Sequence, residues 1–143
     1  MTELPEAATL LGVPLPGGSQ VTHVDYLDWV ARGLPLKALD RIAEVLAPGD
    51  VTFRYRVVSK ASLARFKARR RLGPAQSVVV TRLASVWADA LRVWKEPDAA
   101  RGFLMRPHPL LSDRRPLDLA LENELGADLV RGVLGRLENG SAV

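Results

Sequence analysis

The chain has 143 residues, no cysteine and a formal net charge of +4 at pH 7. Its length fits one compact domain or two small ones that share a core, and without cysteine there is no disulfide, thiolate nucleophile or cysteine-ligated zinc. No apolar run approaches the roughly 20 residues that span a bilayer, and the first residues lack the pattern of a signal peptide, so we expect a cytoplasmic protein that makes no membrane contact.

The charges are distributed unevenly along the chain. Residues 1–50 hold seven acidic and three basic side chains, whereas residues 51–88 hold nine basic ones and no acidic one. Residues 89–116 then carry a net charge of +2 and residues 117–143 a net charge of −3. A basic block between acidic segments indicates contact with a polyanion or with an acidic partner.

Residues 1–22 are predicted to form an irregular arm. Prolines and glycines are frequent there, and the apolar residues show little periodicity. A first helix is predicted to follow, with apolar residues at helical spacing and Gly33 interrupting the pattern. These apolar residues are Val24, Leu27, Ala31 and Leu34.

A second helix is predicted after Pro35, a residue that suits the first helical turn. Its apolar stripe ends before Pro48-Gly49 and consists of Leu36, Leu39, Ile42, Ala43 and Leu46.

Residues 51–58 leave two alternatives open. Val51, Phe53, Tyr55 and Val57 alternate as in a strand, and the composition favours a strand. Asp50 as an N-cap, and the absence of a second strand to pair with, favour a short helix instead.

A basic helix and a long central helix come next. Ser59 or Ser62 can cap the basic helix, which is anchored by Leu63, Phe66 and Leu72. Pro74 opens the longest segment, which is predicted to be a buried helix because its apolar residues recur every three or four positions. These residues are Val80, Leu83, Ala84, Trp87, Leu91 and Trp94.

The last third of the chain is predicted to hold three shorter helices. The first begins at Pro97, the second at Pro116, and a rigid loop with three prolines lies between them. The last runs from Ala127 to Leu137, and Gly140 lies where a C′ residue ends a helix. The inward residues are expected to be Ala100, Phe103 and Leu104 in the first helix and Val130, Val133, Leu134 and Leu137 in the last. We therefore predict an all-α protein.

Residues with catalytic or metal-binding chemistry are sparse. His23 and His108 lack a second ligand at metal spacing. The acidic pairs Asp25/Asp28 and Glu122/Glu124 fit solvated helix residues better than an acid–base pair, and no serine lies in a nucleophile elbow. We expect no metal, no cofactor and no enzymatic activity.

The basic helix is the strongest candidate for a nucleic-acid surface. A helix, a short helix from Val51, a turn at Val58-Ser59 and then a basic helix is the order of a helix-turn-helix, whose second helix enters the major groove. The candidate DNA contacts are Lys60, Ser62, Arg65, Lys67, Arg69, Arg70 and Arg71. Two alternatives remain: a solvated basic surface, and an adaptor that docks an acidic protein.

Several short motifs in this region resemble the Xre-type helix-turn-helix of the Xre/MbcA/ParS antitoxins. They are Gly33-Leu34-Pro35-Leu36, the segment 58–65, Arg71-Leu72-Gly73-Pro74 and Arg82-Leu83-Ala84. Two positions depart from the family pattern: Val57 occupies a turn position that is usually glycine, and Phe66 stands where a second basic residue is common.

The last third resembles the toxin-binding domain of the same family, because its motifs fall in the family's order. They are Ala100-Arg101-Gly102-Phe103-Leu104, Pro107-His108-Pro109-Leu110-Leu111, Arg115-Pro116-Leu117-Asp118-Leu119, Gly126-Ala127 and the segment 134–140. With this resemblance we expect three parts: the arm at 1–22, a helix-turn-helix DNA-binding region at 23–74, and the central long helix with a toxin-binding domain at 75–143.

The resemblance implies an antitoxin whose partner is a RES-domain toxin, a protein similar to ADP-ribosyltransferases that consumes NAD. The terminal domain would cover the active-site cleft of the toxin. The implied toxin contacts are Arg114, Arg115, Pro116, Arg136, Glu138, Asn139 and Gly140, within a final segment that runs on to Val143.

The resemblance also implies autorepression by binding to operator DNA, as a homodimer inside a toxin–antitoxin hetero-oligomer. The alternative function is a stand-alone helix-turn-helix transcription regulator without a toxin, in which the terminal domain serves only dimerisation.

Overall fold

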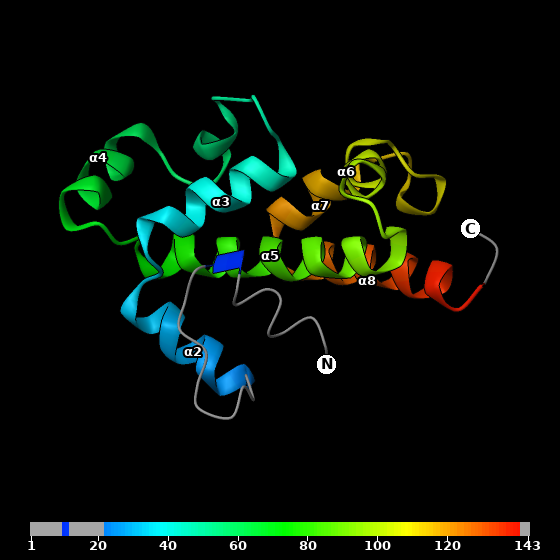
Figure 1. Ribbon diagram of the computed structural model, residues 1–143, viewed down its shortest axis with the longest axis horizontal. Helices are drawn as coiled ribbons and strands as arrows, with labels where there is room; N and C mark the ends of the chain where they lie inside the picture. Colours follow the sequence, from blue (N-terminus) through cyan, green and yellow to red (C-terminus); the bar gives the residue numbers. More distant parts are fainter. Residues whose placement is uncertain (1–9, 12–21, 141–143) are drawn as a thin grey trace. The chain divides into compact units, whose positions relative to one another are not determined.

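The computed structural model describes residues 10–11 and 22–140 (Figure 1). Within these ranges the chain forms helices and two isolated backbone bridges but no β-strand, so the all-α prediction is confirmed. In the same ranges, no helix combines the length and apolar composition that crossing a membrane requires. The chain divides into two compact units, Met1–Ser85 and Val86–Val143, here called the N-terminal and C-terminal units.

The division falls inside the longest helix, α5 (Pro74–Trp94), which contributes its first half to one unit and its second half to the other. Most of the apolar residues predicted to face inward on this helix are buried, although Trp94 is exposed at its end. The predicted arm at 1–22 lies mostly outside the described residues, which include only Leu10, Leu11 and Thr22 from it.

Helix α2 (His23–Arg32) confirms the first predicted helix, but of the four apolar residues that suggested it only Leu34, beyond the helix end, is buried. The hydroxyl of Thr22 accepts the backbone N–H of Asp25, whose carboxylate accepts the N–H of Thr22 in return, and this capping box fixes the helix start. Val24 and Leu27 are 62% and 67% exposed, whereas Tyr26 is buried. The sequence pattern failed because these apolar residues at helical spacing lie on the solvent side.

Helix α3 (Leu36–Leu46) agrees with the prediction, since its stripe of apolar residues is largely buried. After it, the segment at 51–58 forms a 3-10 turn, η1 (Phe53–Arg56), so the helical alternative is right and the strand alternative is wrong. The carboxylate of Asp50 accepts the hydroxyl and the backbone N–H of Thr52 at 2.7 and 2.9 Å. The hydroxyl bond is the main reason that the pKa of Asp50 lies below its usual value.

Helix α4 (Lys60–Arg69) is the predicted basic helix. Ser59 is its N-cap and accepts the N–H of Ser62 at 3.2 Å. Leu63 and Phe66 are buried as expected. The helix ends earlier than Leu72, because Arg70 takes a left-handed conformation with φ 58°.

Backbone hydrogen bonds join the residues at the start of α3 to the residues at the end of α4, and we call this set of bonds the clasp. The N–H of Leu36 donates to the carbonyl of Arg70 at 3.1 Å, and the N–H of Leu72 donates to the carbonyl of Leu34 at 2.9 Å. The guanidinium of Arg71 adds a bond to the carbonyl of Gly33 at 2.8 Å. The clasp therefore fixes the end of α4 against the start of α3.

A buried serine ties the clasp to α5. The Oγ of Ser77 accepts the N–H of Leu34 at 2.9 Å and donates to the carbonyl of Gly73 at 2.8 Å. Ser77 is fully buried, and both bonds are needed because an unpaired buried hydroxyl is costly.

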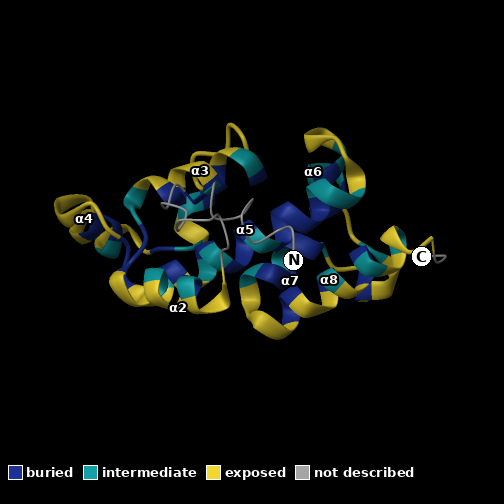
Figure 2. Cartoon of the chain, turned by 60° about the horizontal axis from the view of Figure 1, so that its bottom comes forward, coloured by how far each residue is buried: buried dark blue, intermediate teal, exposed yellow. Residues whose placement is uncertain are grey.

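The C-terminal unit continues from α5 through α6 (Pro97–Met105), η2 (Pro109–Leu111), α7 (Pro116–Glu122) and α8 (Glu124–Glu138). The residues predicted to face inward are buried, except that Leu137 is only partly buried. Figure 2 shows α7 as largely buried. Gly140 takes φ 75° just after the C-cap Asn139, so its role as the residue that ends α8 is confirmed.

Helices α7 and α8 pack closely because Gly126 has no side chain. A Cβ at this position would lie 1.9 Å from the carbonyl oxygen of Leu119 in α7. The side chain of Asn123, between the two helices, accepts the N–H of Gly126 at 2.9 Å and so caps α8.

The clasp predicts a strong effect for Gly33→Ala. Gly33 has φ 87°, and a Cβ there would lie 2.3 Å from the carbonyl oxygen of Leu72. We expect the free energy of unfolding, measured by urea denaturation, to fall by about 3 kcal/mol from backbone strain and overpacking together.

The matched control is Gly49→Ala, where φ is 82° but a Cβ would meet nothing within 4 Å. This variant carries only the left-handed strain and is expected to lose about 1 to 2 kcal/mol. Equal losses in the two variants would show that the close approach of the clasp contributes nothing.

Candidate functional site

The outer face of α4 is narrow and flanked by cations. Helical geometry places Leu63 and Phe66 on the buried side and a ridge of alanines opposite them. Lys60 and Lys67 border this ridge on one side, with Arg65 and Arg69 on the other. All four bases are exposed, as are the ridge residues Ala61, Ala64 and Ala68 (Figure 2).

Three of these four cations lie beside an aromatic ring. The guanidinium groups of Arg65 and Arg69 lie 5.9 and 5.2 Å from the ring centre of Phe66, and the ammonium group of Lys60 lies 5.3 Å from that of Tyr55. Arg65 also donates to the hydroxyl of Ser62 at 3.0 Å.

The other two predicted DNA contacts differ in their surroundings. Arg70 is exposed at the left-handed end of α4, whereas Arg71 is held by its bond to the carbonyl of Gly33 in the clasp. Arg71 therefore has a structural role whether or not it meets DNA.

The two departures from the family pattern are compatible with the fold. Val57 has φ −104°, so the turn before α4 does not require glycine. Phe66 is buried and anchors α4, so it supplies packing where a base is common.

In the C-terminal unit, the loop at 107–116 is closed by a backbone bridge. The N–H of His108 donates to the carbonyl of Arg114 at 3.1 Å, and Ser112 and Asp113 turn the chain with φ 55° and 59°. The Nδ1 of His108 accepts the N–H of Leu110 at 3.1 Å, so this histidine caps η2.

Local interactions hold the predicted toxin contacts that begin at this bridge. Arg114 forms an ion pair with Glu122 at the end of α7. The guanidinium of Arg115 donates twice to Asp118, at 2.9 and 3.3 Å, which fixes the start of α7. Pro116 is buried at the first position of α7, so it presents little surface to a partner.

The predicted contacts at the end of α8 are exposed. Glu138 forms an ion pair with Arg92 of α5. Asn139 and Gly140 donate their N–H groups to the carbonyls of Gly135 and Leu137 at 3.0 and 3.2 Å. Arg136 is exposed in the last turn of α8. Residues 141–143 lie outside the described part of the chain.

A cluster of ion pairs around Asp89 joins α5 to α8, and the sequence interpretation missed it. The Asp89 carboxylate is 11% exposed and lies 3.0 Å from Arg92 and 3.7 Å from Arg131. Arg131 also pairs with Glu124 and Asp128, at 3.0 and 3.2 Å. Hydrogen bonds to Glu138 and then to Asp89 raise the pKa of Arg92, so this guanidinium stays charged.

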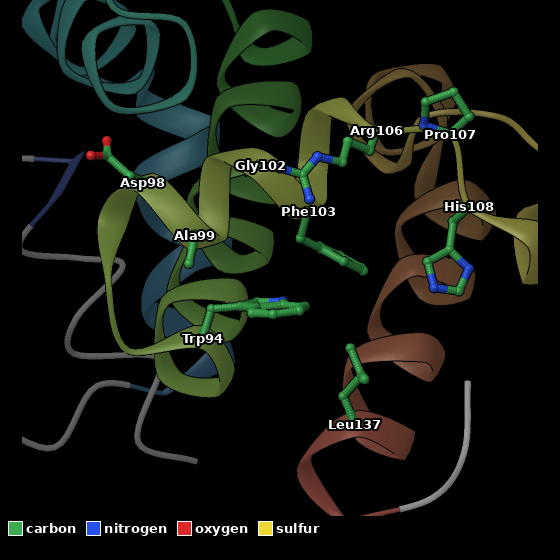
Figure 3. Close-up of a pocket in the computed structure, with 9 residues that line it drawn as sticks. All are labelled: Trp94, Asp98, Ala99, Gly102, Phe103, Arg106, Pro107, His108 and Leu137. Carbon is green, nitrogen blue, oxygen red and sulfur yellow. The ribbon is translucent and has the colours of Figure 1, made fainter.

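A pocket of about 430 Å³ lies beside the end of α8 (Figure 3). Its rings are in contact, since Trp94 and Phe103 have ring centres 5.8 Å apart and Phe103 and His108 have ring centres 6.0 Å apart. The lining residues are Trp94, Asp98, Ala99, Gly102, Phe103, Arg106, Pro107, His108 and Leu137.

The sequence held weak signals for both missed features. Asp89 is an acid inside the otherwise apolar run Val86–Leu91. Because an acid is rarely buried unless it is paired with a cation, its position was a signal for ion pairs. Trp94 continues the stripe of α5 beyond its buried part. The pocket itself brings together four segments of the C-terminal unit, and no local pattern could have joined them.

An aromatic pocket beside exposed arginines has the composition that is enriched at protein–protein interfaces. Residues 89–140 match the family model of the antitoxin Xre/MbcA/ParS C-terminal toxin-binding domain. Residues 89–140, which make up most of the C-terminal unit, are therefore a toxin-binding domain of the Xre/MbcA/ParS antitoxin type, and the resemblance stated from the motifs of this region is confirmed. No curated protein matches the chain.

The close packing of α7 on α8 predicts that Gly126→Ala disrupts this toxin-binding domain. Its Cβ would overlap the carbonyl of Leu119, so the two helices must separate. We expect the free energy of unfolding in urea to fall by about 3 kcal/mol or more.

Gly132→Ala in the same helix is the control, because a Cβ there meets nothing within 4 Å. This variant is expected to gain up to about 1 kcal/mol from helix propensity. A Gly126→Ala protein as stable as the wild type would contradict the close contact.

Proposed function

We propose that this chain is the antitoxin of a type II toxin–antitoxin module and neutralises a RES-domain, NAD-consuming toxin by covering its active-site cleft. The observation that carries the proposal is the match of residues 89–140 to a toxin-binding domain. The exposed end of α8 and the paired arginines of the 107–116 loop supply polar groups for such a contact. Inhibition by occlusion requires no catalytic residue in the antitoxin.

The proposed toxin surface consists of two segments. Arg114 and Arg115 form one, and the last turn of α8 with its C-cap, from Arg136 to Gly140, forms the other. Their local ion pairs reduce the entropy lost on binding, because the side chains are already held.

We propose a second activity, repression of the antitoxin's own operon through α4. The four bases that border the alanine ridge can neutralise phosphates, and the small ridge residues allow the helix axis to approach the floor of the major groove. Residues 51–88 contain no acid that would offset this charge. A homodimer would set the spacing of the two half-sites at one DNA turn or a multiple of it.

Truncation after Gly135 tests the toxin surface. It removes residues 136–143 and the ion pair of Arg92 with Glu138, while α4 is untouched. We expect the truncated chain to bind operator DNA as the full chain does but to leave the toxin free to consume NAD, as measured by NAD loss in a mixture of the two purified proteins. If the truncated chain still protects NAD, the occlusion proposal is wrong.

Replacement of Arg65, Lys67 and Arg69 with alanine tests the DNA surface. These bases are exposed and lie outside the clasp, so the fold is expected to remain. Each lost phosphate contact should reduce the slope of log affinity against log salt by about 0.9, as followed by fluorescence anisotropy with the promoter DNA of the chain's own gene.

Lys37→Ala with Arg41→Ala, which removes two bases instead of three, is the control, because both bases are exposed on α3 in the same unit. The control should keep the salt slope, and both variants should still neutralise the toxin. If the control weakens DNA binding as much as the α4 variant, net charge rather than α4 determines the affinity.

A further inference from the structure

The pocket beside α8 has an apolar interior made of rings. Trp94 from α5 and Phe103 from α6 form one side, with His108 from the loop and Leu137 from α8 opposite them (Figure 3). Trp94 is exposed although it is a large aromatic residue, and its neighbour Phe103 is buried beneath. A volume of about 430 Å³ falls in the range of sites that hold a ligand or a bulky side chain.

The polar groups at this pocket are mainly hydrogen-bond donors. Arg106 is exposed and has no ion-pair partner among residues 22–140. Since the Nδ1 of His108 accepts the N–H of Leu110, the neutral ring carries its proton on Nε2, on the edge that faces the pocket (Figure 3). The guanidinium and this N–H both suit an acceptor that carries negative charge.

Asp98, the carboxylate among the described lining residues, already has a cationic partner. Asp98 has a side chain that is 98% exposed, accepts from Arg101 at 2.9 Å, and points away from the rings (Figure 3). The pocket therefore combines an aromatic interior with a cation, Arg106, that has no ion-pair partner within the described part of the chain, and this combination is complementary to an aromatic group next to an anion.

The pocket also adjoins both segments of the proposed toxin surface. His108 is bridged to Arg114, and Leu137 directly precedes Glu138. All of the lining residues fall within the matched toxin-binding domain.

We propose that this pocket receives an aromatic side chain that the toxin presents beside a carboxylate, and that this contact decides which toxin the antitoxin recognises. The inference rests on the proposed function. The ring of the toxin residue packs against Trp94 and Phe103, and its neighbouring carboxylate pairs with Arg106. Aromatic anchors in desolvated pockets dominate the binding energy of protein interfaces, whereas exposed rim contacts contribute little.

Gly102 offers a way to fill the pocket without harming the fold. It lines the pocket within α6, and a Cβ there would meet only the guanidinium of Arg106, at 3.6 Å or more. Replacement of a helical glycine favours the helix, so Gly102→Leu should occupy the pocket while the thermal midpoint stays equal or rises. Gly102→Ala adds one methyl group and leaves most of the pocket open.

The test measures the affinity of the full-length antitoxin for its purified RES-domain toxin by isothermal titration calorimetry. Gly102→Leu should weaken binding about tenfold or more, and Arg106→Gln should weaken it less and reduce its salt dependence. Gly102→Ala should bind as the wild type does. Gly132→Leu, the same change at an open position of α8, should also bind normally.

The outcomes separate the two proposals. If the wild type binds the toxin and Gly102→Leu binds equally well, the pocket inference is overturned and the proposed function stands. If Gly102→Leu and Gly132→Leu lose affinity equally, the pocket is not the determinant and the inference is again overturned. If the wild type does not bind the toxin, the proposed function fails and the inference fails with it. Should Gly102→Leu unfold, unchanged affinity and salt dependence of Arg106→Gln overturn the carboxylate contact.

Discussion

The geometry of the C-terminal unit depends on the ion pairs around Asp89. This carboxylate is nearly buried on α5 and faces Arg92 and Arg131, which in turn hold residues at both ends of α8. Asp89 is the nearly buried member of this cluster, and a buried carboxylate that loses its cationic partners is costly, so these pairs favour the arrangement in which Arg92 and Arg131 face it. Here they fix α8 along α5, and with it the position of Leu137 in the pocket and of Glu138 beside it.

In the N-terminal unit, hydrogen bonds that involve the backbone fix the helices relative to one another. The clasp and the buried hydroxyl of Ser77 fix the start of α3, the end of α4 and the start of α5 relative to one another. Helix α4 can therefore expose its bases on a supported helix that buries only Leu63 and Phe66. In both units, the exposed residues proposed to bind a partner lie on helices that are held in place by buried contacts. Because these helices are already ordered, less entropy is lost on binding.

Sequence periodicity was sufficient for most of the helices, because prolines mark their starts and apolar residues mark their buried faces. It failed for Val24 and Leu27 of α2, since an apolar residue can lie on the exposed side without a local signal. It could not decide between a strand and a short helix for residues 51–58, because the apolar residues there fit both the alternation of a strand and the spacing of a helix. The candidate contacts were found from charge and motif order, whereas the pocket and the Asp89 cluster depend on residues far apart in the sequence.

Hydrogen–deuterium exchange of the full-length chain, free and bound to its RES-domain toxin, tests the central claim that the toxin is held by the C-terminal unit and DNA by α4. The account predicts that toxin slows exchange in peptides that cover 99–115 and 133–140, and leaves Lys60–Arg69 unchanged. Operator DNA should slow exchange in α4 and leave the C-terminal peptides as they were. Protection of α4 by toxin, with none at the end of α8, would contradict the account.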